Sequence, residues 1–358
     1  HLFTSPHLVR FNERIRIAGR LIGDEALAAL LTEVLDASGG TEPSFFEVAT
    51  AAAFVAFART PADACIVEVG LGGRMDATNV VERPLVCGIA SLGVDHQQFL
   101  GRRLAGIAAE KAGIVKAGTP LVTQLYPPAI ARRIGEVAAA SSARWLPRGG
   151  PWDATVARGK LRYRDHSGSL DLPLPRLPGR HQAMNAALAI AMLRHQDALP
   201  VPAGALNAAM GWAEWPARLQ CLAPGPLTRL LPRGSELWVD GGHNPSAARA
   251  IAAHARRHFA ADLPLSLVFA SLASKDPKAT LEPFQGIARE VRTVPIADHE
   301  FRPPDELAAL ADTMGFDSSA HASLREALGA IRSPARVLLF GSLYLAGEAL
   351  AANDQAPD

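Results

Sequence analysis

Short apolar runs alternate with alanine-rich stretches of helical character along most of this chain. The first half predicts strands at residues 64–69, 85–92 and 120–125, and helices at residues 44–59, 102–112, 128–140 and 182–194. Because parallel strands need helical crossovers, this order is typical of a mostly parallel sheet covered by helices. Residues 153–174 instead alternate polar and apolar side chains around a His-Ser-Gly turn, which predicts an antiparallel hairpin at the edge of that sheet.

A proline-rich tract interrupts the alternation. It holds Pro216, Pro224, Pro226 and Pro232, and beyond it strands are predicted at residues 236–240, 265–272, 291–296 and 337–340. A chain of 358 residues with 49% hydrophobic content exceeds what one ordinary core absorbs. The sequence therefore predicts two α/β domains, at residues 1–216 and at residues 217–358.

Charge and cysteine content argue against several classes of protein. The 36 basic and 35 acidic residues nearly cancel, so no broad basic face for nucleic acid is expected. Cys65, Cys87 and Cys221 are too far apart for a Cys-x-x-Cys site and odd in number, which favours a reducing, cytoplasmic location. The most apolar stretch, residues 48–58, is shorter than a membrane span, so no membrane partner is expected.

A strand of buried type at residues 66–69 runs into a glycine-rich turn that ends in Asp-Ala-Thr-Asn at residues 76–79. A dinucleotide-binding fingerprint fits poorly, because its third glycine falls on Met75 and no helix follows. Glu68 is the unusual residue, since a carboxylate in a strand buried on both faces is costly unless a cation meets it. Spacing alone leaves two interpretations open, a metal ligand or an ion pair with Arg74.

Two further segments have both a local and a functional explanation. Asp95 and His96 follow the next predicted strand, at the carboxyl edge where open α/β sheets bind ligands, although a loop histidine is more often only hydrogen-bonded. Lys111 closes a helix that Gly113 is expected to cap, and a cation is favourable at that end of a helix on structural grounds alone.

The start of the helix at residues 44–59 fits a capping box. Ser44 would be the N-cap and Glu47 would reach back to it, so neither residue needs a functional explanation. Phe45 and Phe46 are predicted to lie in the core or to form the wall of a pocket for a flat aromatic ligand.

A strand-to-helix junction in the second half carries another polar pair. Asn244 as N-cap and Pro245 at the first helical position explain the helix start. They do not explain Asp240 and His243, which would lie together at the carboxyl end of a strand. Three other polar positions fit a solvated linker or helix equally well: Arg218, Gln182 and Asn185.

Taken together, the order and spacing of these segments resemble the folylpolyglutamate synthases, relatives of the Mur ligases that in many bacteria also act as dihydrofolate synthases. The resemblance covers nearly the whole chain and rests on Thr4-Ser5-Pro6-His7-Leu8, Phe45-Phe46-Glu47, residues 68–79, Asp95-His96, residues 110–114, residues 240–245 and Gly341-Ser342-Leu343-Tyr344. It implies a central ATPase-type domain, mostly parallel with an antiparallel edge, followed by a smaller, Rossmann-like glutamate-ligase domain.

The resemblance also implies a metal site. Ser5, Glu68 and His96 would correspond to ligands of magnesium, with two ions expected, and Lys111 to a lysine that is carbamylated. Adding carbon dioxide turns a cationic side chain into an oxygen-bearing anion that suits magnesium. Histidine is a less usual ligand of that ion.

Further residues would hold the nucleotide and the pterin. The resemblance places Asn185 near the ATP base, Arg218 on the phosphates and Asp240 near the ribose, with His243 as a second catalytic residue beside the phosphates. The pteridine pocket would be bordered by two short segments: Ser44, Phe45, Phe46 and Glu47, and Met75, Asp76 and Ala77.

The implied reaction transfers the γ-phosphoryl group of ATP to a substrate carboxylate. The amine of L-glutamate then attacks the acyl phosphate, forming an amide and releasing phosphate, while magnesium and Arg218 offset the gathering charge. The implied acids are dihydropteroate and tetrahydrofolate, and a monomer is expected.

One departure from the family concerns the phosphate loop. Family members carry one upstream of the Ser-Pro-His-Leu segment, but no G-x-x-x-x-G-K-[ST] occurs in this chain, and its first residue is His1, so we expect a truncated or processed N-terminus. Two alternatives therefore stay open. The chain is a catalytically incomplete fragment that binds folate or nucleotide, or it is a Mur-type ligase with a cell-wall substrate.

Overall fold

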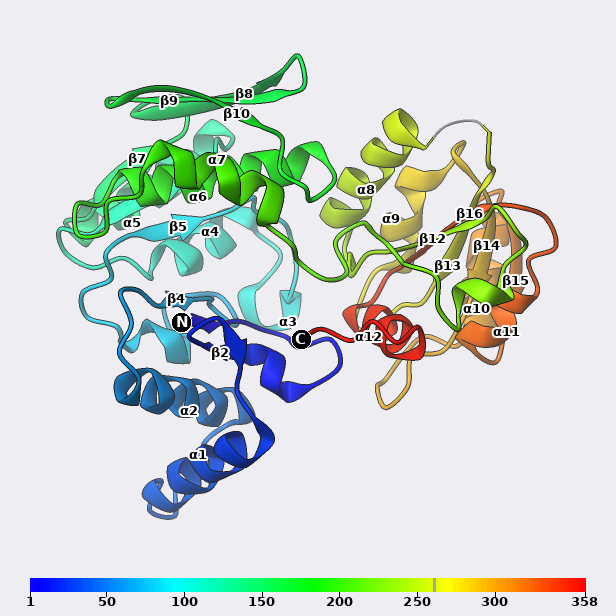
Figure 1. Cartoon of the computed structure of the whole chain (residues 1–358), viewed down its shortest axis with the longest axis horizontal. Coiled ribbons are helices and arrows are strands. Elements are labelled where there is room, and N and C mark those ends of the chain that lie inside the picture. The colour runs from blue at the N-terminus through cyan, green and yellow to red at the C-terminus, as the bar shows by residue number, and fades with distance from the viewer. Residues whose placement is uncertain (260–261) are drawn as a thin grey trace. The chain divides into compact units, whose positions relative to one another are not determined.

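The computed structural model describes residues 1–259 and 262–358, and the chain divides into two compact units. Unit 1 comprises His1–Leu174, Ala183–Trp212 and Asp358, and unit 2 comprises Pro175–Gln182 and Ala213–Pro357. Each unit combines helices with parallel strands (Figure 1), so the predicted α/β class is confirmed. The assignment of functional domains to residues 1–216 and 217–358 stays a prediction.

The described strands of unit 1 form three separate sheets. They are β1 (Leu2–Phe3), β2 (Ile15–Ile17), β3 (Arg20–Leu21), β4 (Ile66–Val67), β5 (Cys87–Ile89), β6 (Pro120–Thr123), β7 (Arg144–Pro147), β8 (Trp152–Ala157), β9 (Lys160–Asp165) and β10 (Gly168–Pro173). The first sheet has the order β3-β2-β1-β4, with β1 antiparallel to β2 and parallel to β4. The second, β5-β6-β7, is parallel, and the third, β10-β9-β8, is antiparallel.

The antiparallel segment differs in extent from the predicted hairpin. It has three strands and forms a sheet of its own, because β8 pairs with β9 along its whole length. In the register of β9 and β10, Asp165 faces Gly168, so the connecting turn is His166-Ser167.

Seven of the described α-helices belong wholly or mostly to unit 1. The first residues of α6 lie in the short segment that is assigned to unit 2. The seven helices are α1 (Asp24–Ala37), α2 (Phe45–Arg59), α3 (Gln97–Leu100), α4 (Leu104–Ala112), α5 (Pro128–Ala140), α6 (Arg180–Arg194) and α7 (Ala203–Trp212). One cluster of buried side chains joins α1 and α2 to the first sheet, and another joins α4 and α5 to β5 and β6. The predicted helices at 44–59, 102–112, 128–140 and 182–194 are thus confirmed within two residues at each end.

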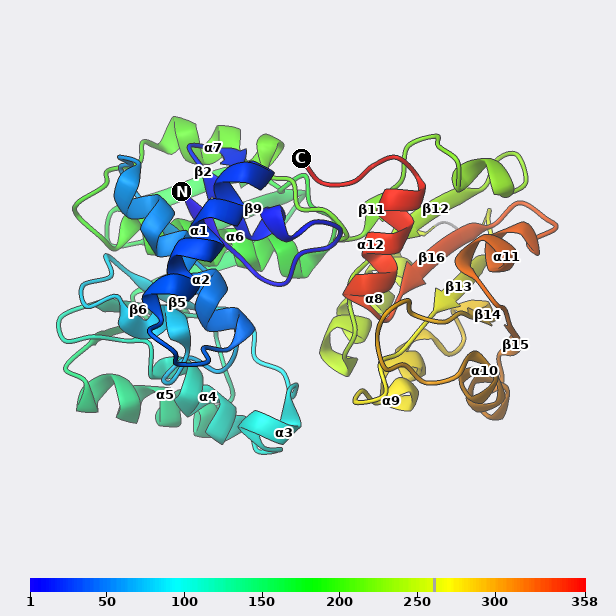
Figure 2. The ribbon, with the colours of Figure 1, turned by 90° about the horizontal axis from the view of Figure 1, so that it is seen from below.

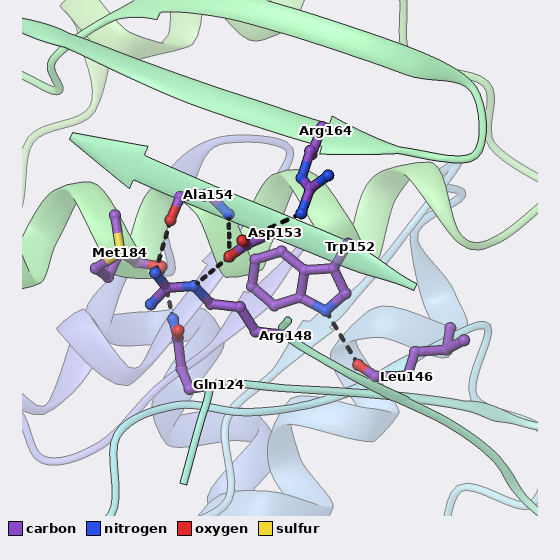
Figure 3. Close-up of polar contacts among 8 residues, drawn as sticks. All are labelled: Gln124, Leu146, Arg148, Trp152, Asp153, Ala154, Arg164 and Met184. Carbon is purple, nitrogen blue, oxygen red and sulfur yellow. Dashed lines mark hydrogen bonds and ion pairs between the residues drawn. The ribbon is translucent and has the colours of Figure 1, made fainter. Parts of the chain in front are cut away.

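The antiparallel sheet lies along α6 and α7, as Figure 1 shows. Its inner face contributes the fully buried rings of Trp152 and Tyr163, which stack with centroids 6.0 Å apart. Figure 3 shows how the sheet is attached: Trp152 Nε1 donates to Leu146 O at 3.0 Å, and Arg148 pairs with Asp153 at 3.1 Å. The sheet is therefore fixed by polar contacts as well as by its apolar face.

Unit 2 is built on a single six-stranded sheet among its described residues. The strands are β11 (Gln220–Cys221), β12 (Glu236–Val239), β13 (Leu265–Phe269), β14 (Ala288–Thr293), β15 (Asp317–Ala320) and β16 (Arg336–Phe340), in the order β11-β12-β16-β13-β14-β15. All neighbours are parallel except β11, which pairs antiparallel with β12 at one edge. The predicted strands at 236–240, 265–272, 291–296 and 337–340 correspond to β12, β13, β14 and β16.

The helices of unit 2 cover this sheet. They are α8 (Pro245–His258), α9 (Pro277–Leu281), α10 (Pro304–Thr313), α11 (Leu324–Gly329) and α12 (Leu343–Ala352). α12, drawn in red in Figure 2, packs against β16. The buried rings of Phe269 and Phe284 both contact Phe340 in the core. The ring centroids are 5.1 Å apart for Phe269 and Phe340, and 4.7 Å apart for Phe284 and Phe340. Within the residues that the structure describes, no helix combines the length and hydropathy that a bilayer span requires.

Candidate active site

Ser5 and Glu68 lie together because β1 and β4 are parallel neighbours. The backbone N–H of Glu68 donates to Phe3 O at 2.9 Å, which extends the pairing of the two strands by one residue. In return, the Glu68 carboxylate accepts the backbone N–H of Ser5 at 3.1 Å and the hydroxyl of Thr4. The structure therefore brings two of the three predicted metal ligands into contact, and it adds Thr4, which sequence reasoning missed.

The expected burial of Glu68 is wrong. Its side chain is exposed, and so is that of the neighbouring Ile66 in β4, an edge strand of its sheet. The proposed ion pair with Arg74 is not what the structure shows either. The Arg74 guanidinium lies 3.1 Å from Glu110 on α4, and the Arg74 N–H donates to Glu110 O at 2.8 Å.

The glycine-rich turn is fastened around Asp76. One carboxylate oxygen accepts the N–H of Leu71 at 2.8 Å, and the other accepts both the N–H and the hydroxyl of Thr78, at 3.0 and 2.5 Å. Gly73 lies against the end of α4, where an added Cβ would come within 2.7 Å of Glu110 O. The turn and α4 therefore form one fixed element, and Asp76 is the residue that shapes it.

Lys111 lies in the last turn of α4, and Gly113 caps that helix as predicted. Burial lowers the pKa of the Lys111 ammonium, while the nearby carboxylates of Asp76, Glu68 and Asp95 act in the opposite direction. The helix-end explanation therefore holds for the backbone. It does not account for a half-buried lysine whose ammonium interacts electrostatically with carboxylates from two different loops, the one after β4 and the one after β5.

His96 is presented differently from Lys111. It is exposed, has a φ of +50°, and begins α3 (Gln97–Leu100), while its N–H donates to Asp95 Oδ1 at 2.8 Å. Asp95, rather than His96, is the residue of this pair whose charge acts on Lys111. The sequence predicted a strand at residues 85–92 that ends beside this pair, but β5 (Cys87–Ile89) ends at Ile89, so Asp95 and His96 lie in the loop that follows it.

The predicted substrate segment at residues 44–47 begins α2. The capping box is confirmed: Ser44 N donates to Glu47 Oε2 at 2.7 Å and Glu47 N donates to Ser44 Oγ at 3.3 Å. Phe46 is a partly buried ring packed against the core, tilted against Phe3 with centroids 5.8 Å apart, and it lies against Gly70, where an added Cβ would be 2.3 Å from the ring. Phe45, by contrast, is 61% exposed.

Phe45 is part of an aromatic and cationic cluster that the sequence did not reveal. Its ring meets Phe11 edge-on at 5.4 Å, and the Arg14 guanidinium lies 5.3 and 5.4 Å from the two ring centroids. Arg14 is buried and donates from Nε to His7 Nδ1 at 2.9 Å. The buried Glu13 carboxylate holds the preceding loop by accepting three successive backbone N–H groups, at 2.7 to 2.8 Å.

The second predicted substrate segment places its three side chains differently. Met75 is 79% exposed, Ala77 is half-buried, and Asp76 is buried within the turn. Met75 and Phe45 are therefore the residues of the two segments that offer apolar surface to a ligand.

In unit 2, Arg218, Asp240 and His243 gather at the carboxyl end of β12. The buried Asp240 carboxylate accepts the N–H of Leu219 at 2.8 Å and that of Gly242 at 2.7 Å. Burial raises the pKa of Asp240, and the Arg218 guanidinium and these hydrogen bonds oppose that shift. His243 Nδ1 shares a hydrogen with Gly241 O at 3.0 Å, which orients its ring.

The remaining predicted positions of the second half are also accounted for. Asn244 caps α8 through Oδ1, which accepts from Ala247 N at 3.0 Å, and Pro245 is the first helical residue, as predicted. Asn185 lies exposed on α6. Sequence reasoning did not single out His181. Burial lowers the pKa of this histidine, and the nearby Arg218 charge lowers it further.

Comparisons with known proteins are consistent with one another. No protein-family model matches the chain. The dihydrofolate synthase/folylpolyglutamate synthase of Bacillus subtilis is 34% identical over 83% of this chain and 68% of its own length. The structure of E. coli FolC in complex with DHPP and ADP has a TM-score of 0.87 and 28% identity, covering 99% of this chain and 81% of that one. A second similar structure is a bifunctional folylpolyglutamate synthase/dihydrofolate synthase of Yersinia pestis with AMPPNP and a manganese ion. It has a TM-score of 0.85 and 27% identity, and the match covers 98% of this chain and 81% of the Yersinia chain.

Proposed function

This chain belongs to the folylpolyglutamate synthase/dihydrofolate synthase family of the Mur ligases, and on that premise we propose its substrates and the residues that act on them. It is an ATP-dependent ligase that forms an amide bond by adding L-glutamate to folates. We propose dihydropteroate and reduced folates such as tetrahydrofolate as the accepting acids. Relatives that bind ATP analogues and a divalent metal support ATP and magnesium as the cosubstrate and the ion.

The observation that carries this proposal is the environment of Lys111. The carboxylates of Glu68 directly after β4, of Asp76 in the glycine-rich turn and of Asp95 in the loop after β5 all act electrostatically on its ammonium. Hard divalent cations take oxygen ligands, so this donor set fits magnesium. We propose that Ser5 and Glu68 hold the first ion, and that two ions are needed to offset the collected negative charge.

We further propose that Lys111 acts as its carbamate. A lysine reacts with carbon dioxide only as the neutral amine, and burial favours that form by lowering the pKa. The carbamate would add another anion to three carboxylates, so its formation depends on the cations. His96 completes the ion site in this proposal only if its exposed ring turns inward, so we rank it below Glu68 as a ligand.

When bound, magnesium would neutralise charge on the phosphate oxygens during phosphoryl transfer. Arg218 would add a fixed positive charge beside the phosphates, while Asp240 and Asn185 would position the ribose and the base. The ring of His243 is held by Gly241 O and would face the phosphates. The substrate carboxylate would accept the γ-phosphoryl group, ADP would leave, and the glutamate amine would then displace phosphate from the acyl phosphate.

We propose that the pterin ring lies between the surfaces of Phe45 and Met75, the exposed apolar side chains of the two predicted segments. Ser44 and Glu47 would contribute by fixing the start of α2, and Asp76 and Ala77 by shaping the turn. We also propose that the protein is a monomer. We place it in the cytoplasm, which three cysteines outside any disulfide support.

The test measures ADP release from the full-length gene product with magnesium, L-glutamate and either acid, omitting each component in turn. Release should need all components and should fall about a hundredfold or more in Lys111→Ala and Glu68→Ala. The matched controls Lys160→Ala and Glu25→Ala change exposed residues outside the site and should leave the rate unchanged. A folded protein that releases no ADP with either acid, or that keeps its rate in Lys111→Ala, would refute the assignment.

The carbamate has a test of its own. Protein equilibrated with ¹³C-bicarbonate and magnesium should show a carbamate carbon resonance that is absent from Lys111→Ala. Full activity after carbon dioxide has been removed, with no such resonance, would contradict this part of the proposal and leave the ligase reaction standing.

A further inference from the structure

Three potential metal ligands meet at the turn of the antiparallel sheet, and none belongs to the candidate active site. Asp165 ends β9, His166 lies in the two-residue turn to β10, and His195 directly follows α6. One ligand atom from each of the three lies within 4.8 Å of the others, and the two imidazole centroids are 5.2 Å apart. The turn and the end of the helix thus converge through side chains that bind metals.

The Asp165 carboxylate is buried and already oriented. Its side chain is fully covered, and it accepts both Nε and Nη2 of Arg194, at 2.6 and 2.7 Å. The Tyr163 hydroxyl donates to it at 3.0 Å and the Ser167 N–H at 2.8 Å. These four contacts occupy all the lone-pair positions of the two oxygens, so an ion bound by Asp165 must displace one of these donors, and the remaining hydrogen bonds would then fix the ligand.

His195 supplies an independent observation. The residue is only 6% exposed, and its Nε2 is buried without a hydrogen-bond partner among the described residues. Its backbone carbonyl accepts from Arg144 at 2.9 Å, so the residue is well anchored while its ring nitrogen is not satisfied. A buried polar atom without a partner destabilises the fold, and a bound cation would remove that penalty.

We propose that Asp165, His166 and His195 form a binding site for a divalent transition-metal cation such as Zn²⁺, which links the β9–β10 turn to the end of α6. Two imidazole nitrogens and one carboxylate oxygen favour zinc, cobalt, nickel or copper over magnesium and calcium. A fourth position would be left for water. The site is separate from the proposed catalytic ions, which have oxygen ligands.

Closing the site requires the ligand atoms to come closer together. Ligand atoms around tetrahedral zinc lie about 3.3 Å apart, since each bond is about 2.0 to 2.2 Å long, whereas the three here lie within 4.8 Å of one another. The exposed His166 ring, in a two-residue turn, can rotate towards the other two ligands once its Nε2 gives up the contact with Ser167 Oγ, 3.0 Å away. The Arg194 charge opposes the cation, so we expect reversible binding that holds the turn in place, rather than a metal on which folding depends.

The experiment uses the full protein without a polyhistidine tag, treated with a chelator and then titrated with Zn²⁺ by calorimetry in excess magnesium. The excess magnesium occupies oxygen-ligand sites, so the result does not depend on the proposed ligase function. One equivalent of Zn²⁺ should bind, and His166→Gln should weaken that binding at least about tenfold. Co²⁺ in place of Zn²⁺ should give the visible absorption of a tetrahedral complex, which His166→Gln should lose.

The matched control is His258→Gln on α8. That exposed histidine stacks on His254 at 4.5 Å, one helical turn away, and is a second place where two imidazoles meet. His258→Gln should leave the one-equivalent Zn²⁺ binding unchanged. Both variants change surface residues, and circular dichroism will show that both are folded. Zn²⁺ binding that is lost in His258→Gln but kept in His166→Gln, or no binding to the wild-type protein, would overturn the proposal.

Discussion

Replacing Gly73 by alanine tests the idea that the glycine-rich turn and α4 form one fixed element. A Cβ at this position would lie 2.7 Å from Glu110 O, 2.8 Å from Ile114 Cγ2 and 3.1 Å from Lys111 Cα. Two of these three atoms are helix backbone, which cannot rotate away as a side chain can. The turn or the helix must therefore shift.

The size of the effect follows from overpacking. Inserting a methyl group into a well-packed interior costs about 1 to 3 kcal/mol, and the backbone contacts at Gly73 favour the upper end. With a urea m-value of about 3 kcal/mol per M, a loss of about 2 kcal/mol lowers the unfolding midpoint by about 0.7 M. Because the shift moves the segment that carries Lys111, ADP release should fall more than the population of folded protein does.

Gly106→Ala provides the matched control. Gly106 lies in the same helix, and an added Cβ there would meet nothing within 4 Å. Alanine should stabilise α4 by up to about 1 kcal/mol, because it is the better helix former. Urea unfolding followed by circular dichroism, with ADP release on the same samples, compares the two variants. A Gly73→Ala protein with the midpoint and activity of the wild type would refute the reasoning.

Other substitutions test the loop at residues 8–10 that Glu13 holds, the exposed ring of Phe45 and the titration of His254. Glu13→Gln should lower the free energy of unfolding by about 3 kcal/mol, because an amide cannot accept all three backbone N–H groups that the carboxylate holds. The control Glu25→Gln changes an exposed residue and should alter the free energy of unfolding by less than about 0.5 kcal/mol. Phe45→Ala should raise KM for the pterin acid with little loss of stability, and Phe99→Ala, also exposed, should change neither. Burial and neighbouring imidazoles lower the pKa of His254 to about 4. The unfolded chain therefore takes up the proton first as the pH falls. The contribution of His254 to stability should be full above pH 6.5 and should be lost as the pH drops towards 4. The side chain is only half-buried, so the loss should be well below the roughly 3 kcal/mol of the whole shift, and His254→Gln should reduce the pH dependence of the urea midpoint.

Each of these expectations has an outcome that contradicts it. Equal urea midpoints for Glu13→Gln and wild type would mean that the loop is held by other contacts. An unchanged KM in Phe45→Ala would remove that ring from the pterin surface. A pH dependence that persists in His254→Gln would assign the acid sensitivity to another group.

Local chemistry determined much of what the sequence predicted correctly. The capping box of Ser44 and Glu47 and the Asn244-Pro245 helix start depend on neighbours within four residues, so their partners could be read from spacing. The alternation of strand and helix similarly predicted the parallel sheets, because it reflects a requirement for crossover connections. Spacing also placed Glu68 at a strand end, and in the structure its charge acts on Lys111 together with that of Asp95 from the loop after β5.

The tertiary structure decided which of those polar residues face one another. Arg74 turned to Glu110 on α4 instead of Glu68, and Asp95 rather than His96 acts on Lys111. Glu68 is exposed, and β4 is an edge strand; both depend on strand order and packing, which no local pattern encodes.

The three-dimensional packing also created clusters with no sequence signature. Arg14 reaches both Phe11 and Phe45, and His195 comes to lie beside the turn that carries His166. The contacts of Arg14 with Phe45 and of His195 with His166 join residues about 30 positions apart, and their formation depends on how helices and sheets pack. The sequence by itself therefore determined the family, the elements and the strand ends where chemistry would lie. Only the packed chain determined the side-chain partners, because burial and facing direction are properties of the whole core.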